Sequence, residues 1–116
     1  MIYTDYKIIK GLSDAEIIEL KKTIYQYNYK QKTPIRNSLQ IIFDSKSAMV
    51  STNVKSIIFY NYRIIYENPN FIHSWWFDSD FIDVQGKKGL KISFRHSKSV
   101  ISETIILFDE LKIVQV

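Results

Sequence analysis

The sequence predicts an α+β fold in which an N-terminal helix packs on a twisted antiparallel β-sheet, a meander of about five to seven strands. One segment carries a helix-start signature followed by apolar residues at helical spacing. Most of the chain after it alternates between apolar and polar residues, and turn-forming residues separate these runs, which is typical of hairpins. At 116 residues the chain has the length of one domain, so 1–116 is expected to form a single domain.

The predicted helix covers residues 13–29. Ser13 and Glu16 have the spacing of a capping box, in which each side chain bonds the backbone N–H of the other. The loop 30–36 that follows ends the helix, because it contains Pro34, which cannot continue a helix. The apolar residues at helical spacing are Ile17, Leu20, Ile24 and Tyr27. A short strand is expected before the helix, where Ile2, Tyr6 and Ile8 alternate with polar residues.

The remaining elements are predicted as strands. Alternation in 89–96 should point Leu90, Ile92 and Phe94 into the core. Residues 102–116 form one long strand or two strands joined at Asp109 and Glu110. The other expected strands are 39–44 with a short partner in 45–50, 54–67 with Tyr60 and Tyr62 on the face of Val54 and Ile58, and 71–77.

The formal net charge of +4 is unevenly distributed. Five cations and no acid fall between Lys21 and Arg36, which can indicate a nucleic acid, an anionic surface or an acidic protein partner. Tyrosines interleave with these cations, a pattern that suits base stacking together with phosphate binding. The basic surface would comprise Lys30, Lys32 and Arg36. The chain has no cysteine, no signal-peptide pattern and no membrane-spanning run, so a cytoplasmic location and no membrane partner are expected.

The segment 70–84, NFIHSWWFDSDFIDV, is the most aromatic of the chain. As a strand it has two apolar faces, which a strand buried on both sides explains without any function. In the functional alternative, one of Trp75 and Trp76 lies in the core and the other in a contact surface. A turn or bulge at 78–80 should expose Asp78 and Asp80 at the end of the strand. The predicted partner-binding residues are Trp75, Trp76, Asp78, Asp80 and Asp83. The three aspartates lack the glycine and glutamate positions of a calcium loop, so no metal site is predicted.

The sequence contains no strong catalytic motif. His73 and His96 have no partner at ligand or catalytic spacing, and no glycine-rich phosphate loop is present. Glu110 and Lys112 have the E-x-K spacing of restriction-type nucleases, with Asp78 or Asp83 as a possible second carboxylate, but that family needs further structure after this strand. No catalytic residue and no cofactor is therefore predicted.

The stretch WWFDSDFIDVQGKKGLKISF with the closing TIILFDELKIVQV resembles small bacterial immunity proteins of polymorphic and contact-dependent toxin systems. The resemblance implies a cytosolic inhibitor that neutralises a cognate toxin or effector by covering its active site. A phage-type inhibitor of host defences has the same physical profile. The alternative is a nucleic-acid-binding domain that uses the basic helix 13–29 and the loop 30–36.

Overall fold

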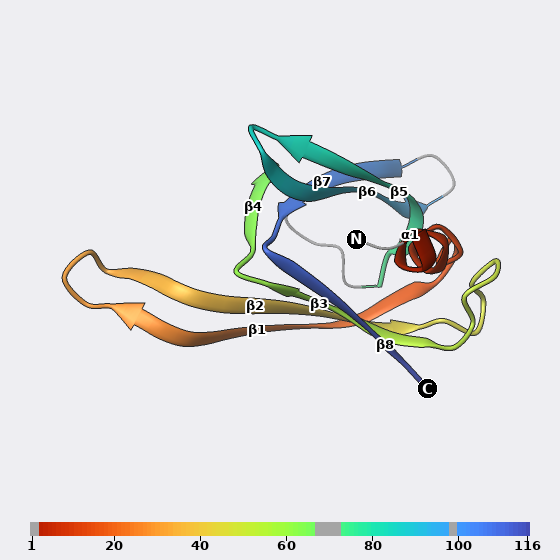
Figure 1. The fold of residues 1–116 in the computed structure, drawn as a ribbon. Coiled ribbons are helices and arrows are strands. Elements are labelled where there is room, and N and C mark those ends of the chain that lie inside the picture. Colours follow the sequence, from red (N-terminus) through yellow and green to blue (C-terminus); the bar gives the residue numbers. More distant parts are fainter. Residues whose placement is uncertain (1–2, 67–72, 98–99) are drawn as a thin grey trace.

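The computed structural model describes residues 3–66, 73–97 and 100–116, and in them the chain is an all-β protein with one short helix (Figure 1). The predicted α+β class is therefore wrong. Eight antiparallel strands form one sheet in the order β4-β7-β6-β5-β1-β2-β3-β8. The elements are α1 (Tyr3–Lys10), β1 (Glu16–Asn28), β2 (Thr33–Asp44), β3 (Val54–Tyr60), β4 (Arg63–Tyr66), β5 (Trp75–Val84), β6 (Lys87–Ser97), β7 (Val100–Leu107) and β8 (Glu110–Gln115).

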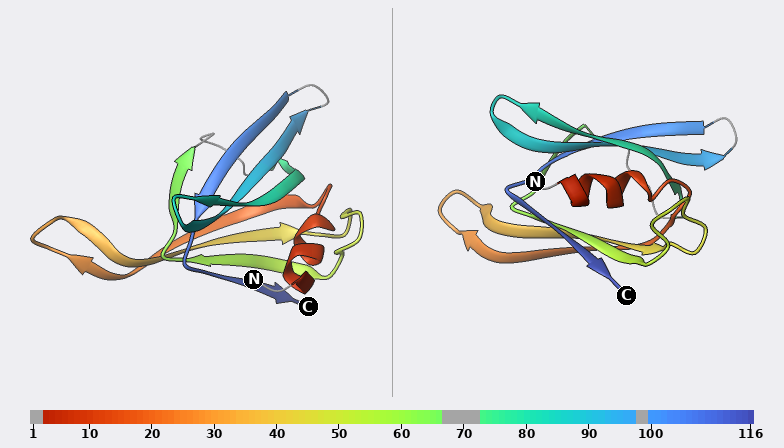
Figure 2. Two further views of the ribbon diagram at one scale, coloured as in Figure 1. Left: turned by 45° about the horizontal axis from the view of Figure 1, so that its top comes forward. Right: turned by 45° about the vertical axis from the view of Figure 1, so that its right-hand side comes forward.

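The sheet folds over on itself into two facing layers. Figures 1 and 2 show β1, β2, β3 and β8 in one layer and β5, β6, β7 and β4 in the other, with α1 between them at one side. Consecutive strands pair within β1-β2-β3 and within β5-β6-β7, so the predicted meander exists in two pieces. One hydrophobic core draws residues from α1 and from both layers.

The two layers are joined where β1 begins. The ladder between β1 and β5 contains only the pair Glu16 and Trp75. Backbone hydrogen bonds extend this junction: Trp76 N–H donates to the Ala15 carbonyl (2.8 Å) and Asp14 N–H donates to the Trp76 carbonyl (2.7 Å). Beyond this point β1 and β5 separate, which leaves room between the layers for the core.

Helix α1 fills the opening beside β5. Ile9 is buried, the Tyr6 ring lies 5.8 Å from that of Phe81, and Lys10 reaches acids on β5. These three helix residues share one face, at i, i+3 and i+4. The strand predicted from the alternation of Ile2, Tyr6 and Ile8 is therefore wrong for the residues that the structure describes, which form α1. The contacts with the rest of the protein are instead made at the helical spacing of Tyr6 and Ile9.

The predicted helix 13–29 is also wrong, because this segment forms β1. Ser13 does not cap a helix; its hydroxyl donates to the Phe77 carbonyl at 3.1 Å. The helical spacing arises from bulges in the ladder with β2, one between Ile17 and Glu19 and another between Ile24 and Gln26. A bulge inserts one residue, so two core-facing positions move from a separation of two to a separation of three. Ile17 and Leu20 contribute to the core in this way.

The predicted strand 54–67 is two strands, β3 and β4, which are consecutive in the chain but far apart in the strand order of the sheet. The chain turns at Asn61, whose φ is +51°, and β3 and β4 end up near opposite edges. A bulge between Val54 and Ser56 also reverses the expected faces, so that Ile57 and Phe59 are buried. No strand forms in 45–50.

The predictions for the C-terminal part are confirmed in two respects. Leu90, Ile92 and Phe94 of β6 are fully buried. The last segment is two strands, β7 and β8, separated at Phe108 and Asp109. The turn or bulge predicted at 78–80 is misplaced: the bulge lies between Trp76 and Asp78, and from Asp78 to Val84 β5 pairs regularly with β6. Residues 71 and 72 of the predicted strand 71–77 lie outside the described residues.

Candidate functional site

The feature that stands out from the body is the hairpin of β1 and β2, which we call the arm (residues 21–36) (Figure 1). These strands have 13 and 12 residues, about twice the usual strand length. The β2–β3 ladder covers only Ser38 to Ile42 of β2, so the outer part of the hairpin is a two-stranded ribbon. Every arm residue except Asn28 is exposed.

The arm carries the charge asymmetry of the whole protein. It holds five of the sixteen cations and none of the twelve acids, so the remainder has eleven cations, twelve acids and a net charge of −1. Lys21 and Lys22 lie at the base of the arm, where β2 still pairs with β3. Of the predicted basic surface, Lys30 and Lys32 lie in the turn at the outer end of the arm, whereas Arg36 pairs with Gln26 nearer its base. All three are exposed.

Apolar side chains lie exposed among these cations. A two-stranded ribbon with no layer against it gains little from burial, so exposed apolar groups on it call for a partner. Tyr25 is partly engaged, since the Arg36 guanidinium lies 5.8 Å from its ring centre and the Ser38 hydroxyl donates to its hydroxyl at 3.4 Å. Tyr27 and Tyr29 contact each other, with 5.1 Å between their ring centres. The exposed apolar residues of the arm are Ile24, Tyr25, Tyr27, Tyr29 and Ile35.

The two predicted partner-binding tryptophans divide between core and surface, so β5 is not buried on both sides at this point. Trp76 is fully buried, and its indole N–H donates to the Ser79 hydroxyl at 3.2 Å. Trp75 keeps 38% of its surface exposed. It lies in a row with Arg95 and Ile101 across β5, β6 and β7, and the Arg95 guanidinium lies 4.8 Å from the ring centre of exposed Phe77. Trp75 is therefore available to a partner, whereas Trp76 is a structural residue.

The three predicted acids do not form one surface. Lys10 of α1 bonds both Asp78 (3.0 Å) and Asp80 (2.8 Å), so one cation partly neutralises this pair. Asp83 is eight positions from Trp75 at the far end of β5, roughly 25 Å away. Its carboxylate accepts the Gly86 N–H at 2.8 Å and so shapes the β5–β6 turn. No local pattern predicts the Lys10 contacts, because they join residues 68 and 70 positions apart in the sequence.

The ion pairs of Lys10 predict an acid-sensitive contribution to stability. The hydrogen bond from Lys10 holds the pKa of Asp78 below its usual range, although partial burial opposes this. A carboxyl group whose pKa is lowered by folding stabilises the fold above its unfolded pKa and loses this effect as the pH falls through the folded value. Lys10→Gln should therefore lower stability slightly at pH 7, and its deficit relative to wild type should shrink below about pH 4.

Urea denaturation of both proteins from pH 7 down to about pH 3 measures this difference. Lys46→Gln, which removes an exposed lysine distant from α1 in the sequence, is the charge control. A Lys10→Gln deficit that stays constant over this range would show that the ion pairs do not contribute.

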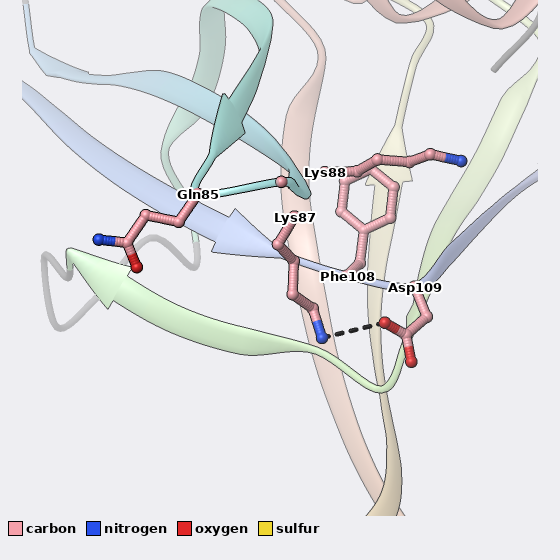
Figure 3. Close-up of a pocket in the computed structure, with 6 residues that line it drawn as sticks. Gln85, Lys87, Lys88, Phe108 and Asp109 are labelled. Carbon is pink, nitrogen blue, oxygen red and sulfur yellow. Dashed lines mark ion pairs between the residues drawn. The ribbon is translucent and has the colours of Figure 1, made fainter.

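An open depression of about 420 Å³ lies beside the β5–β6 turn (Figure 3). Lys87 and Asp109 point toward each other and form an ion pair at 3.0 Å, while Lys88 points away from them. Hydrogen bonds from Lys87 and the Asn61 amide hold the pKa of Asp109 below its usual range. The residues that line the depression are Gln85, Gly86, Lys87, Lys88, Phe108 and Asp109. This set contains no histidine, cysteine or hydroxyl group, and its one carboxylate is already paired.

The other catalytic candidates are not assembled into a site. The His96 ring bonds the Ser102 hydroxyl at 2.5 Å, and His73 is exposed with a φ of +66°. Glu110 and Lys112 lie on β8, and three strands (β1, β2 and β3) separate β8 from Asp78 and Asp83 on β5. Among residues 3–66, 73–97 and 100–116, no group of three or more metal-ligating side chains could hold an ion.

No helix in the part of the chain that the structure describes is long and apolar enough to cross a membrane. No family model, curated protein or solved structure matches this chain.

Proposed function

We propose that this protein is a non-catalytic, cytoplasmic binding protein that holds a nucleic acid with its arm. The observation that carries the proposal is the segregation of charge. A protein body with a net charge of −1 projects a ribbon with five cations, no acid and several exposed aromatic rings. Cations that alternate with aromatic side chains are the combination that binds phosphates and bases together.

The arrangement of the arm suits a long polyanion. Because cations occur at the base and at the outer end of the ribbon, an extended ligand can contact them in succession. The charge asymmetry also orients the molecule during approach, since the arm is attracted to phosphate while the body is not. No cofactor is needed for this role.

The proposal predicts strongly salt-dependent binding of wild-type protein to labelled oligonucleotides of about ten nucleotides, measured by fluorescence anisotropy. If all five cations contact phosphates of a single strand, the affinity should fall roughly 100-fold between about 50 and 200 mM salt. Absence of binding to both single-stranded and duplex nucleic acid at the lower salt concentration would show that the proposal is wrong.

A protein partner is the second candidate, and the exposure of Trp75 and Phe77 favours it. Trp75, Phe77 and Ile101 form an exposed apolar area on the outer face of β5-β6-β7, and the Arg95 guanidinium lies beside it. Aromatic and arginine side chains dominate protein-binding hot spots. An inhibitor of the immunity type, or a phage anti-defence inhibitor, would use this area with Asp78 and Asp80 at its border to cover a toxin or effector.

The two candidates use different surfaces and are separated by variants. Trp75→Ala combined with Phe77→Ala should abolish capture of a stoichiometric protein partner and leave oligonucleotide binding intact. Neutralising the cations of the arm should weaken oligonucleotide binding and leave capture of the protein partner intact. A partner that is retained equally by both variants would count against the Trp75 area.

A further inference from the structure

The tip of the arm has a defined backbone conformation. The Asn28 side-chain carbonyl accepts the backbone N–H groups of Lys30 and Gln31, both at 3.1 Å. Lys32 completes the turn in the left-handed region with a φ of +54°. An asparagine that bonds the backbone two and three residues ahead restricts the turn it precedes. The side chains of the tip are thus presented from a restricted backbone.

Tyr29 is the most exposed aromatic residue of the arm, with 83% of its surface accessible. Its ring lies 5.1 Å from that of Tyr27 at an interplanar angle of 68°, an edge-to-face contact that orients the ring without covering it. Tyr25 differs, because Arg36 and Ser38 already contact it. Lys30 and Lys32 follow Tyr29 in the turn, one and three positions further along. The tip therefore offers one open aromatic ring and two cations within a single turn.

On these grounds, and resting on the proposed function, we propose that the arm binds single-stranded nucleic acid, with one base stacked on Tyr29 and the adjacent phosphates held by Lys30 and Lys32. An aromatic ring binds a base through its face, and this face is available only when the base is unpaired and unstacked. In a duplex the bases present their edges, which are read by hydrogen bonds. Ile24, Ile35 and the rings of Tyr27 and Tyr29 match base faces better than base edges.

Single-residue variants and an abasic strand test the stacking contact. The probe is a labelled single strand of about ten thymidines, and the comparison strand has the same phosphates without bases. Tyr29→Ala should weaken binding of the thymidine strand about 10-fold, while Tyr29→Phe should bind within about twofold of wild type, since the ring remains. The abasic strand should bind wild type and Tyr29→Ala equally. The slope of affinity against salt should be the same for all three proteins, because no cation changes.

Because Tyr29 is exposed, its replacement should leave the fold intact, and an unchanged thermal midpoint checks this. The inference is overturned if Tyr29→Ala binds the thymidine strand as wild type does, if the abasic strand shows the same loss, or if a duplex binds as tightly as the single strand. In each of these cases salt-dependent binding by the arm still supports the proposed function. Absence of all nucleic-acid binding removes both.

Discussion

Replacement of Trp76 by alanine is expected to lower the free energy of unfolding by about 3–5 kcal/mol. Trp76 has no exposed surface, and its ring contacts Phe43 of one layer (5.4 Å between ring centres) and Phe94 of the other (6.0 Å). Its backbone also forms hydrogen bonds at the junction of the two layers. Truncation removes these contacts and leaves a cavity between the layers. Since small domains are stable by only about 5–15 kcal/mol, the variant should be partly unfolded at moderate temperature.

Trp75→Ala is the matched control, because it makes the same change one residue away on the outer face. Its cost should stay below about 1 kcal/mol, as is usual for exposed positions. Urea denaturation followed by circular dichroism measures both values. If the two variants lose similar stability, or if Trp75→Ala loses more, the assignment of Trp76 as the core residue is wrong.

Neutralising three cations of the arm is expected to have the largest effect on binding. The variant carrying Lys30→Gln, Lys32→Gln and Arg36→Gln should lose affinity for single-stranded DNA on the order of 100-fold at about 50 mM salt. The slope of log affinity against log salt should also become shallower by about 2, because three phosphate contacts are lost. All three residues are exposed, so stability should change little.

The control for this variant changes the net charge equally but outside the arm. Lys46→Gln, Lys55→Gln and Lys112→Gln remove three exposed cations of the body, so both triple variants have a formal net charge of +1. The body variant should bind nearly as wild type, with only a small general loss. Equal loss in both variants would mean that net charge, and not the arm, governs binding. Unchanged binding by the arm variant would contradict the proposed function.

Several parts of the fold follow from local sequence. The alternation of Leu90, Ile92 and Phe94 correctly predicted the inner face of β6, because β6 pairs with β7 without a register shift from Gly89 to Arg95. The break near Asp109 was also predicted as one of two options. In these places the side-chain period of two acts without interruption.

The largest error came from positions where the period is interrupted. Bulges in β1 produced the separation of three between Ile17 and Leu20, and a helix has nearly the same spacing. The capping signature at Ser13 and Glu16 then favoured the wrong choice. The same cause reversed the faces of β3, where a bulge follows Val54. A bulge depends on how a strand pairs with its partner, so the sequence of one segment alone does not predict it.

The candidate site shows the same division. That residues 21–36 are basic and rich in tyrosine, and that one of two adjacent tryptophans belongs in the core, can be read from the sequence alone. The three-dimensional structure was needed to show that 21–36 is an exposed arm, that Trp76 is the buried residue, and that Lys10 pairs with Asp78 and Asp80. Charge and hydrophobicity are properties of each residue. Exposure and pairing instead depend on strand contacts between residues distant in the chain, such as β1 with β2 and α1 with β5.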